Sequence, residues 1–348
     1  MHLLMPLPIK RVLAIIILSV INHSFGLAQA GTTRKITAGE IIQKALDNEG
    51  GDAKLDSITA VEFISQIVTA KGDTLSYAVK RKGFDKYYIS VLSAAYENST
   101  TIYNKGKATI VKNEQSKNIN DVLILEDLKL QSYISINYGY KKMGYKLERL
   151  DDQKFKNFDC YVVMAESGLD KRQLNYYDKK TGDLIMCIYP NGNKSVFIDF
   201  YEAKGVRCPS AILMVDTAND ITKSRLTKID YDENLDDNWF TLPAEGHYVA
   251  PDIFKEGTYK YINSNTGVTM TRTKDSQVEI DGNSKHLFKI SWISDNDYLL
   301  YGDASNPPEV KKNGYLHVRI ITWSGNKYYC HYQTENGIGG TCAFEKIK

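Results

Sequence analysis

The 348-residue chain lacks an excess of charge of either sign, since 44 lysines and arginines stand against 42 aspartates and glutamates. Two of the basic residues, Lys10 and Arg11, lie in a predicted export signal, so the chain that follows it carries equal numbers of both signs. Nucleic-acid binding needs a concentrated basic face, and electrostatic attachment to anionic membranes needs clustered basic residues. We therefore expect neither nucleic acid nor a charged membrane surface as a partner.

The sequence also lacks the familiar catalytic signatures, with no G-x-S-x-G, H-E-x-x-H, Walker or C-x-x-C motif. The paired acids at 151–152 and 236–237 are adjacent in loops and do not face each other across a cleft. His317, His331, Cys330 and Cys342 match no standard zinc spacing. We therefore expect no enzyme, no metal and no cofactor; a hydrolase with an unrecognised site is kept as a third alternative.

Long apolar runs are absent except at the N-terminus. A basic pair precedes the apolar run at 12–21, and Ala28-Gln29-Ala30 offers the small residues that signal peptidase requires. The run is too short to span a bilayer stably, so we expect a signal peptide over residues 1–30, with an uncleaved anchor as the alternative. No cysteine near the predicted cleavage point would accept a lipid. The sequence thus predicts a periplasmic or secreted protein without stable membrane insertion.

The number of cysteines is odd, which leaves at least one unpaired. Cys330 and Cys342 flank a glycine-rich hairpin turn; a cross-strand disulfide is compatible with this turn, but spacing alone does not establish it. Cys160, Cys187 and Cys208 lie in separate apolar segments typical of strands, where buried thiols are the usual interpretation.

Two helices are predicted. The first begins at the capping-box sequence Thr37-Ala38-Gly39-Glu40, carries an apolar stripe that includes Ile41, Ile42 and Leu46, and ends at Gly50-Gly51. The second is expected from Asn120 to about Tyr138, because nothing interrupts the stretch before Gly139; the alternation at Ile134–Ile136 leaves a strand as the alternative there. Its predicted apolar side holds Val122, Leu125 and Leu128.

The rest of the chain reads as short strands rich in β-branched and aromatic residues, separated by turn signals. Such short connections indicate antiparallel strands, because parallel strands need long crossovers. We expect a mainly β (α+β) protein with an antiparallel open half-barrel over residues 31–246, covered by one or two helices. A small C-terminal antiparallel β barrel or curled sheet is expected over residues 247–348, after a boundary at Pro243–Pro251. The abundant tyrosines fit strands by themselves, although they could also line a ligand site.

The sequence predicts about a dozen strands but only two helices. A sheet with an apolar face must cover that face, and two helices can cover only part of so wide a sheet. The uncovered part could close on itself, pack on the C-terminal unit or form a cavity for an apolar guest. The apolar stripes of the two helices are candidates for ligand contact and equally for ordinary core. These candidates are Ile41, Ile42, Leu46, Val122, Leu125 and Leu128.

The order of these features resembles the LolA-like superfamily, whose best-known members carry lipoproteins across the periplasm. The resemblance covers about residues 36–243 and is carried by a helix that ends in Gly50-Gly51 before the first strand and by four later segments: Phe155–Val163, Tyr176–Leu184, Gly205–Pro209 and Trp239–Pro243. It implies an open β half-barrel, plugged by helices, that holds acyl chains in a hydrophobic cavity. No basic residue is matched to the carriers' cavity arginine, and the segment after Pro251 has no counterpart in simple carriers.

The sequence therefore predicts an exported, non-enzymatic protein that binds a hydrophobic ligand, an acyl chain or a lipidated protein. The alternative is a structural or protein-interaction module of the cell envelope without a ligand cavity. The two differ in whether the space between sheet and helices is open or filled. The oligomeric state and the identity of the ligand are not determined by the sequence.

Overall fold

The computed structural model describes residues 35–93, 98–231, 234–262, 267–302 and 314–348. The predicted signal peptide and its cleavage point lie outside these residues. No helix in the described part of the chain is long and apolar enough to cross a membrane.

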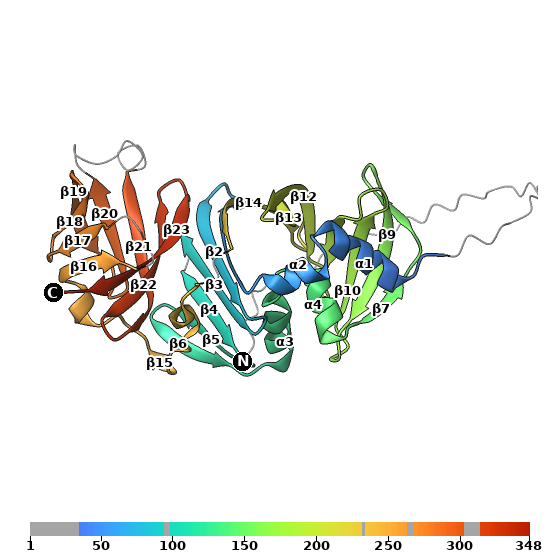
Figure 1. Ribbon diagram of the computed structural model, residues 1–348, viewed down its shortest axis with the longest axis horizontal. Coiled ribbons are helices and arrows are strands. Elements are labelled where there is room, and N and C mark those ends of the chain that lie inside the picture. The colour runs from blue at the N-terminus through green and yellow to red at the C-terminus, as the bar shows by residue number, and fades with distance from the viewer. Residues whose placement is uncertain (1–34, 94–97, 232–233, 263–266, 303–313) are drawn as a thin grey trace, which may run out of the picture. The chain divides into compact units, whose positions relative to one another are not determined.

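Most of the described chain N-terminal to Gly257 forms one antiparallel sheet of fifteen strands (Figure 1). In spatial order it runs β15-β6-β5-β4-β3-β2-β1-β14-β13-β12-β11-β10-β9-β7, with β8 also paired to β9. The bounds are β1 Ala60–Val68, β2 Thr74–Lys82, β3 Lys86–Ser93, β4 Ser99–Asn104, β5 Lys107–Lys112, β6 Gln115–Ile119, β7 Lys146–Arg149, β8 Gln153–Phe155, β9 Phe158–Glu166, β10 Arg172–Asp178, β11 Leu184–Ile188, β12 Lys194–Ala203, β13 Val206–Val215, β14 Ile221–Asp230 and β15 Gly246–His247. The pairing of β1 with β14 joins two meanders that are far apart in sequence, and a register shift between Ile64 and Ser65 interrupts it.

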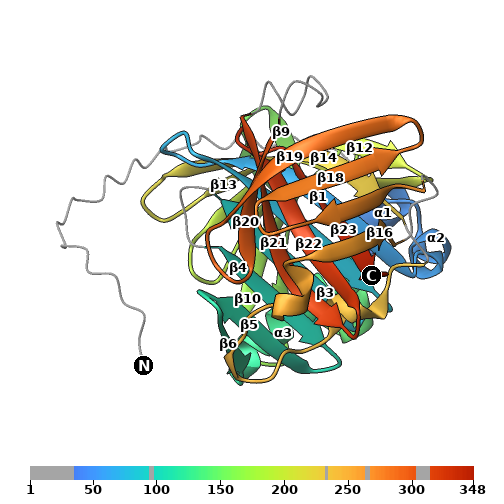
Figure 2. The same ribbon diagram turned by 90° about the vertical axis from the view of Figure 1, so that its left-hand side faces the viewer.

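The eight C-terminal strands close into an antiparallel barrel, seen from a second direction in Figure 2. The barrel consists of β16 Gly257–Tyr261, β17 Thr269–Arg272, β18 Ser276–Asp281, β19 Ser284–Trp292, β20 Asp297–Gly302, β21 Tyr315–Ser324, β22 Lys327–Thr334 and β23 Gly339–Lys346. Pairing of β16 with β23 closes it. Two short 3-10 helices, η1 Asp237–Phe240 and η2 Asp252–Phe254, precede it. The predicted fold class is confirmed; the division into domains at residue 246 stays a prediction.

The first helix, α1 (Ala38–Asn48), begins as predicted. The Thr37 hydroxyl accepts the Glu40 amide at 3.2 Å, and the Glu40 carboxylate accepts the Thr37 amide at 2.8 Å. After Gly50-Gly51, whose positive φ angles suit glycine, a second short helix follows, α2 (Asp52–Ser57), which was not expected.

The single helix expected over residues 120–138 is wrong, because the chain forms α3 (Val122–Gln131) and α4 (Ile136–Met143) with a break between them. The Ser135 hydroxyl accepts the amides of Asn137 and Tyr138 and so starts a new helix. Gly139 lies inside α4, which ends instead at Gly144 in the left-handed conformation. The connection at residues 132–135 lies beside the site described next.

Candidate functional site

Strands β1 to β3 present alternate residues to two different environments, as the two-residue period of a strand requires. On one face, Phe63 and Ile67 of β1 and Tyr77, Val79 and Arg81 of β2 line a cavity. We call this the cavity face. On the other face, Ile64 and Ala78 pack into a cluster with the barrel residues Ile321, Tyr329 and Ala343. We call this the barrel face.

The cavity has a volume of about 520 Å³. It lies over the middle strands β2, β1, β14, β13 and β12, whereas α3 packs on β3 and β4 and α1 packs on β7 and β9, towards the two ends of the sheet. The cavity therefore lies between the middle strands and the helices, and Ala45 of α1, Leu55 of α2 and Leu130 of α3 also line it. The apolar part of the wall includes Phe63, Ile67, Tyr77, Val79, Tyr87, Tyr189, Phe197, Ile212, Met214 and Leu226. A concave, mainly apolar site of this size matches pockets of roughly 300–1,000 Å³ that hold one small ligand.

A half-buried arginine belongs to this wall. Arg81 donates from Nε to the carbonyl of Gln131 at 2.7 Å and from Nη1 to the carbonyl of Ile134 at 3.3 Å. Its guanidinium lies 5.1 Å from the ring centroid of Phe63 and 5.9 Å from that of Tyr87. Burial lowers the pKa of this guanidinium, which means that the site disfavours its charge. Arg81 thereby holds the connection between α3 and α4 against the sheet.

A half-buried carboxyl group contacts the same connection. Glu49, which caps the C-terminus of α1, accepts from the Ser135 hydroxyl and from the Asn137 amide, the latter at 2.7 Å. Burial raises the pKa of Glu49 to about 7, against the lowering effect of the two hydrogen bonds; nearby Asp183 raises it further. The carboxyl group therefore exchanges its proton near neutral pH.

The second arginine of the wall, Arg207, is paired. Its Nε and Nη2 each lie 3.1 Å from an Asp183 oxygen, and Asn48 also donates to this carboxylate. Beside Arg207, the thiol of Cys208 is part of the wall and is half-buried, and burial raises its pKa to about 11. Among the described residues, the cavity wall therefore contains an arginine paired with Asp183, an arginine that donates to two carbonyls, the carboxyl group of Glu49 and the thiol of Cys208.

The six residues predicted for ligand contact lie outside this wall. Ile41, Ile42 and Leu46 are buried on α1, and Leu125 and Leu128 pack in the cluster beneath α3. Val122 is 61% exposed, so it does not belong to the buried side of α3 as expected. Contact between these residues and a ligand stays a prediction.

The sequence did not predict that Arg81 and residues of β12 to β14 line the cavity, because both placements depend on long-range strand pairing. The only local signal was the alternation of apolar residues in β1 and β2.

The barrel face differs from the cavity face because its buried lysine and histidine have polar side-chain partners. The fully buried His331 of β22 lies 2.8 Å from the Ser76 hydroxyl through Nε2 and 3.1 Å from the Ser90 hydroxyl through Nδ1. Burial, aided by the positive charge of Lys80, lowers the pKa of His331 to about 3, so the ring is neutral. Both of its nitrogens are occupied and its ring is fully buried, so the pair of Ser76 and His331 has the features of an interface contact.

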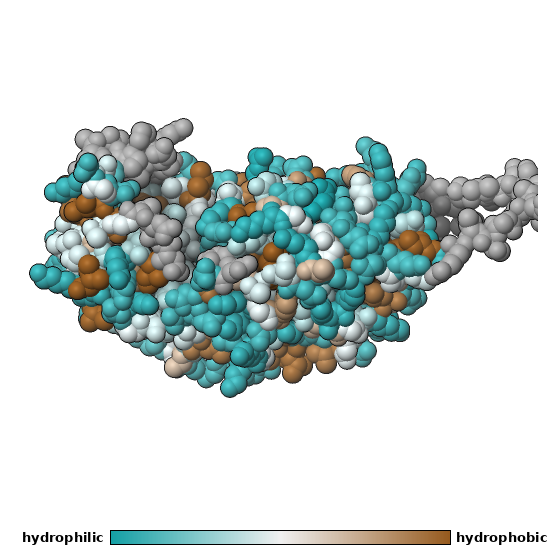
Figure 3. Space-filling view, in the orientation of Figure 1, coloured by the Kyte–Doolittle hydropathy of each residue, from teal (hydrophilic) through white to brown (hydrophobic). Residues whose placement is uncertain are grey.

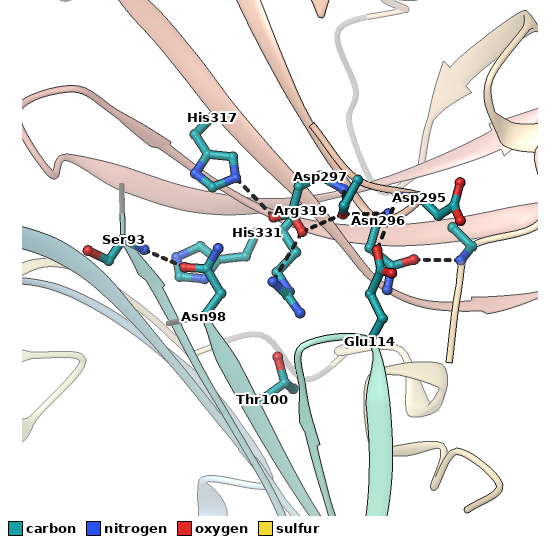
Figure 4. Close-up of polar contacts among 12 residues, drawn as sticks. Ser93, Asn98, Thr100, Glu114, Asp295, Asn296, Asp297, His317, Arg319 and His331 are labelled. Atoms are coloured by element: carbon teal, nitrogen blue, oxygen red, sulfur yellow. Dashed lines mark hydrogen bonds and ion pairs between the residues drawn. The ribbon is translucent and has the colours of Figure 1, made fainter. Parts of the chain in front are cut away.

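Within the barrel, two polar residues of β21 converge on one acid (Figure 4). Asp297 accepts from His317 Nε2 at 2.9 Å and from Arg319 Nη1 at 3.1 Å. The thiols of Cys330 and Cys342 face each other in register on β22 and β23 with their sulfurs 2.8 Å apart, and the structure has both as free thiols. Their disulfide stays a prediction. In the described residues, no group of three or more His, Cys, Asp or Glu side chains is arranged to hold a metal.

Comparisons with known proteins give structural neighbours only, since no family profile and no curated protein matches the chain. A LolA superfamily protein from Nitrosomonas europaea is 16% identical, with a TM-score of 0.44, and the match covers 60% of this chain and 98% of that one. An outer-membrane lipoprotein-sorting protein domain from Vibrio parahaemolyticus is 12% identical, with a TM-score of 0.41 and coverages of 57% and 95%. A DUF1329 family protein from Desulfovibrio piger is also 12% identical, with a TM-score of 0.42 and coverages of 59% and 97%. The neighbours include LolA superfamily proteins, as the resemblance in the sequence predicted, but all three TM-scores lie below 0.5.

Proposed function

We propose that the protein is an exported, non-enzymatic binding protein that holds one acyl chain or similar apolar ligand in the cavity over β1, β2 and β12–β14. The observation that carries the proposal is the mainly apolar space of about 520 Å³ between the middle strands of the sheet and the helices. Apolar surface exposed to water inside such a space is unfavourable, and an apolar guest removes it at roughly 25 cal/mol per Å².

The surface supports the same function. On the face seen in Figure 3, hydrophilic residues prevail and hydrophobic residues are scattered among them. That face offers little continuous hydrophobic surface to which an apolar ligand could bind. The interior cavity is therefore the better candidate for the binding site. The structural-module alternative requires a filled space beneath the helices, and the cavity counts against it.

The proposal is tested by blocking the cavity. Ser224 of β14 lines the cavity, and its neighbour Arg225 is exposed on the opposite face. We expect Ser224→Trp to abolish displacement of a fluorescent fatty-acid probe by palmitate, because the indole fills the space. Arg225→Trp adds the same side chain outside the cavity and serves as the matched control.

Native mass spectrometry of protein purified from its own envelope, followed by lipid extraction, supplies the second readout. Protein that is consistently empty and that shows no probe displacement would overturn the proposal. Equal binding by the Ser224→Trp and wild-type proteins would place the ligand elsewhere.

A further inference from the structure

Arg81 carries a charge without an anionic partner. Among the residues that the structure describes, no carboxylate lies within ion-pair distance of its guanidinium, and the groups that act on it through charge are Tyr87, Tyr77, Cys208 and Tyr231. All of these are neutral near pH 7 in a buried site. The positive charge is therefore offset only by two carbonyl oxygens and two aromatic rings.

The acids that line the cavity are engaged elsewhere. Asp183 is bound bidentately by Arg207, and Glu49 accepts from Ser135 and Asn137. Neither acid is therefore available to neutralise Arg81. A charge that is partly removed from water is unfavourable unless it is paired, so the half-buried charge of Arg81 leaves the wall prepared for an anion.

The guanidinium also keeps donors for a ligand. Arginine has five N–H groups, and the protein acceptors at Gln131 and Ile134 use two of them. The remaining donors belong to the two terminal nitrogens, whose planar fork matches a carboxylate or phosphate. Apolar wall residues such as Phe197, Ile212 and Met214 belong to the same cavity and would surround an alkyl chain.

Building on the proposed function, we infer that the ligand is a single-chain amphiphile with an anionic oxygen head group, bound at Arg81 while its alkyl chain occupies the apolar part of the cavity. A fatty-acid carboxylate and an alkyl phosphate share this head-group chemistry. A neutral ester or a cationic amphiphile of the same chain length lacks it.

The test compares four ligands with the same sixteen-carbon chain by displacement of a fluorescent probe from the wild-type protein at pH 7.5. These are palmitate, hexadecyl phosphate, methyl palmitate and hexadecyltrimethylammonium. We expect at least one of the two anions to bind about 10- to 100-fold more tightly than the ester, as charge-assisted hydrogen bonds predict. Preference for palmitate or for the phosphate supports the inference and identifies the head group.

Arg81→Gln should reduce the affinity for the anions to that of methyl palmitate and leave the ester unchanged. Arg225→Gln removes a charge from the other side of β14 and is the control, expected to keep the wild-type preference. Circular dichroism establishes whether the Arg81 variant folds, and the wild-type ligand series decides the question if it does not.

The two proposals fail in distinguishable ways. If none of the four ligands binds, the proposed function is wrong. If the ester binds as tightly as both anions, the acyl-binding function stands and the anionic head group is excluded. A preference for anions that survives Arg81→Gln would assign it to another group.

Discussion

The two faces of strand β2 show how one element serves two purposes. Lys80 and Arg81 are consecutive, so they point to opposite faces. Lys80, on the barrel face, forms an ion pair with Glu62 of β1, donates to Thr341 of β23 at 2.8 Å and lies 4.1 Å from the Trp239 ring centroid. Arg81, on the cavity face, has carbonyls and rings but no described carboxylate partner. A face on which the buried charges Lys80 and Glu62 are paired suits a permanent interface, whereas a charge without a described carboxylate partner beside an open space suits an exchangeable occupant.

The largest expected effect is in the hydrophobic part of the barrel face. Trp239 is buried between Tyr88 and Tyr329, with ring centroids 5.4 and 5.1 Å away. Trp239→Ala should lower the free energy of unfolding by about 3–5 kcal/mol, as for other large core truncations. Phe197→Ala, on the cavity wall, should cost only about 1–2 kcal/mol because its side chain already borders open space. Urea unfolding measures both, and equal losses would mean that the cavity is packed in solution.

The next effect concerns the charges on the two faces. Glu62→Gln leaves Lys80 buried without its carboxylate and should lower the free energy of unfolding by about 3 kcal/mol. Arg81→Gln removes a charge that has no carboxylate partner, so its effect on the ligand-free protein should be about 1 kcal/mol or less. Thermal and urea unfolding of both variants provide the comparison. A loss for Arg81→Gln as large as that for Glu62→Gln would show that Arg81 is a structural cation.

The acids beside the cavity and on the barrel face should change the free energy of unfolding in opposite directions with pH. Burial raises the pKa of Glu49 from its usual 4.5 to about 7 in the folded protein. The stability that its protonated form contributes is therefore fully present below about pH 4.5 and is lost as the pH rises through 7. For Glu62, burial would raise the pKa, but Lys80 and Lys228 outweigh it and hold the pKa at about 2. Its contribution is therefore present above about pH 4.5 and is lost as pH falls towards 2.

The Glu49 contribution is at most about 3 kcal/mol for such a shift, and solvent in the cavity reduces it. Glu49→Gln should flatten the dependence of unfolding free energy on pH between 4.5 and 7 and leave the acid limb unchanged. Chemical denaturation across this range measures it. A variant with the same slope as wild type would show that Glu49 titrates normally and is hydrated in the folded protein.

Local patterns in the sequence were sufficient for much of the fold. The capping box at Thr37, the glycine pair after α1 and the alternation in β1 and β2 each predict their element from neighbouring residues. One helix was predicted over 120–138 where the chain forms two, because serine is tolerated inside a helix and also caps one. Ser135 therefore gives no unambiguous signal. Helix α3 is apolar on several sides, so its periodicity did not reveal that Val122 is exposed.

The site was less predictable than the fold for a physical reason. The mismatch between sheet width and helices left three outcomes open, one of which was a cavity, and the sheet side of the observed cavity comes from β1–β3 and β12–β14. These strands meet only through the pairing of β1 with β14. Arg81 is one of many basic residues in the sequence. Its burial without a carboxylate follows from that pairing and from the helix connection at Gln131–Ile134.

The most direct measurement of the central claim uses the protein's own thiols. Cys208 lies in the cavity wall, whereas Cys342, similarly half-buried, lies in the barrel. Wild-type protein is freed of lipid, reduced so that Cys342 is a thiol, freed of the reductant, treated with a thiol reagent with or without saturating palmitate, and analysed by peptide mass mapping. The account predicts that palmitate slows modification of Cys208 at least several-fold and leaves Cys342 unchanged. Labelling of Cys208 at the same rate with and without palmitate would contradict it.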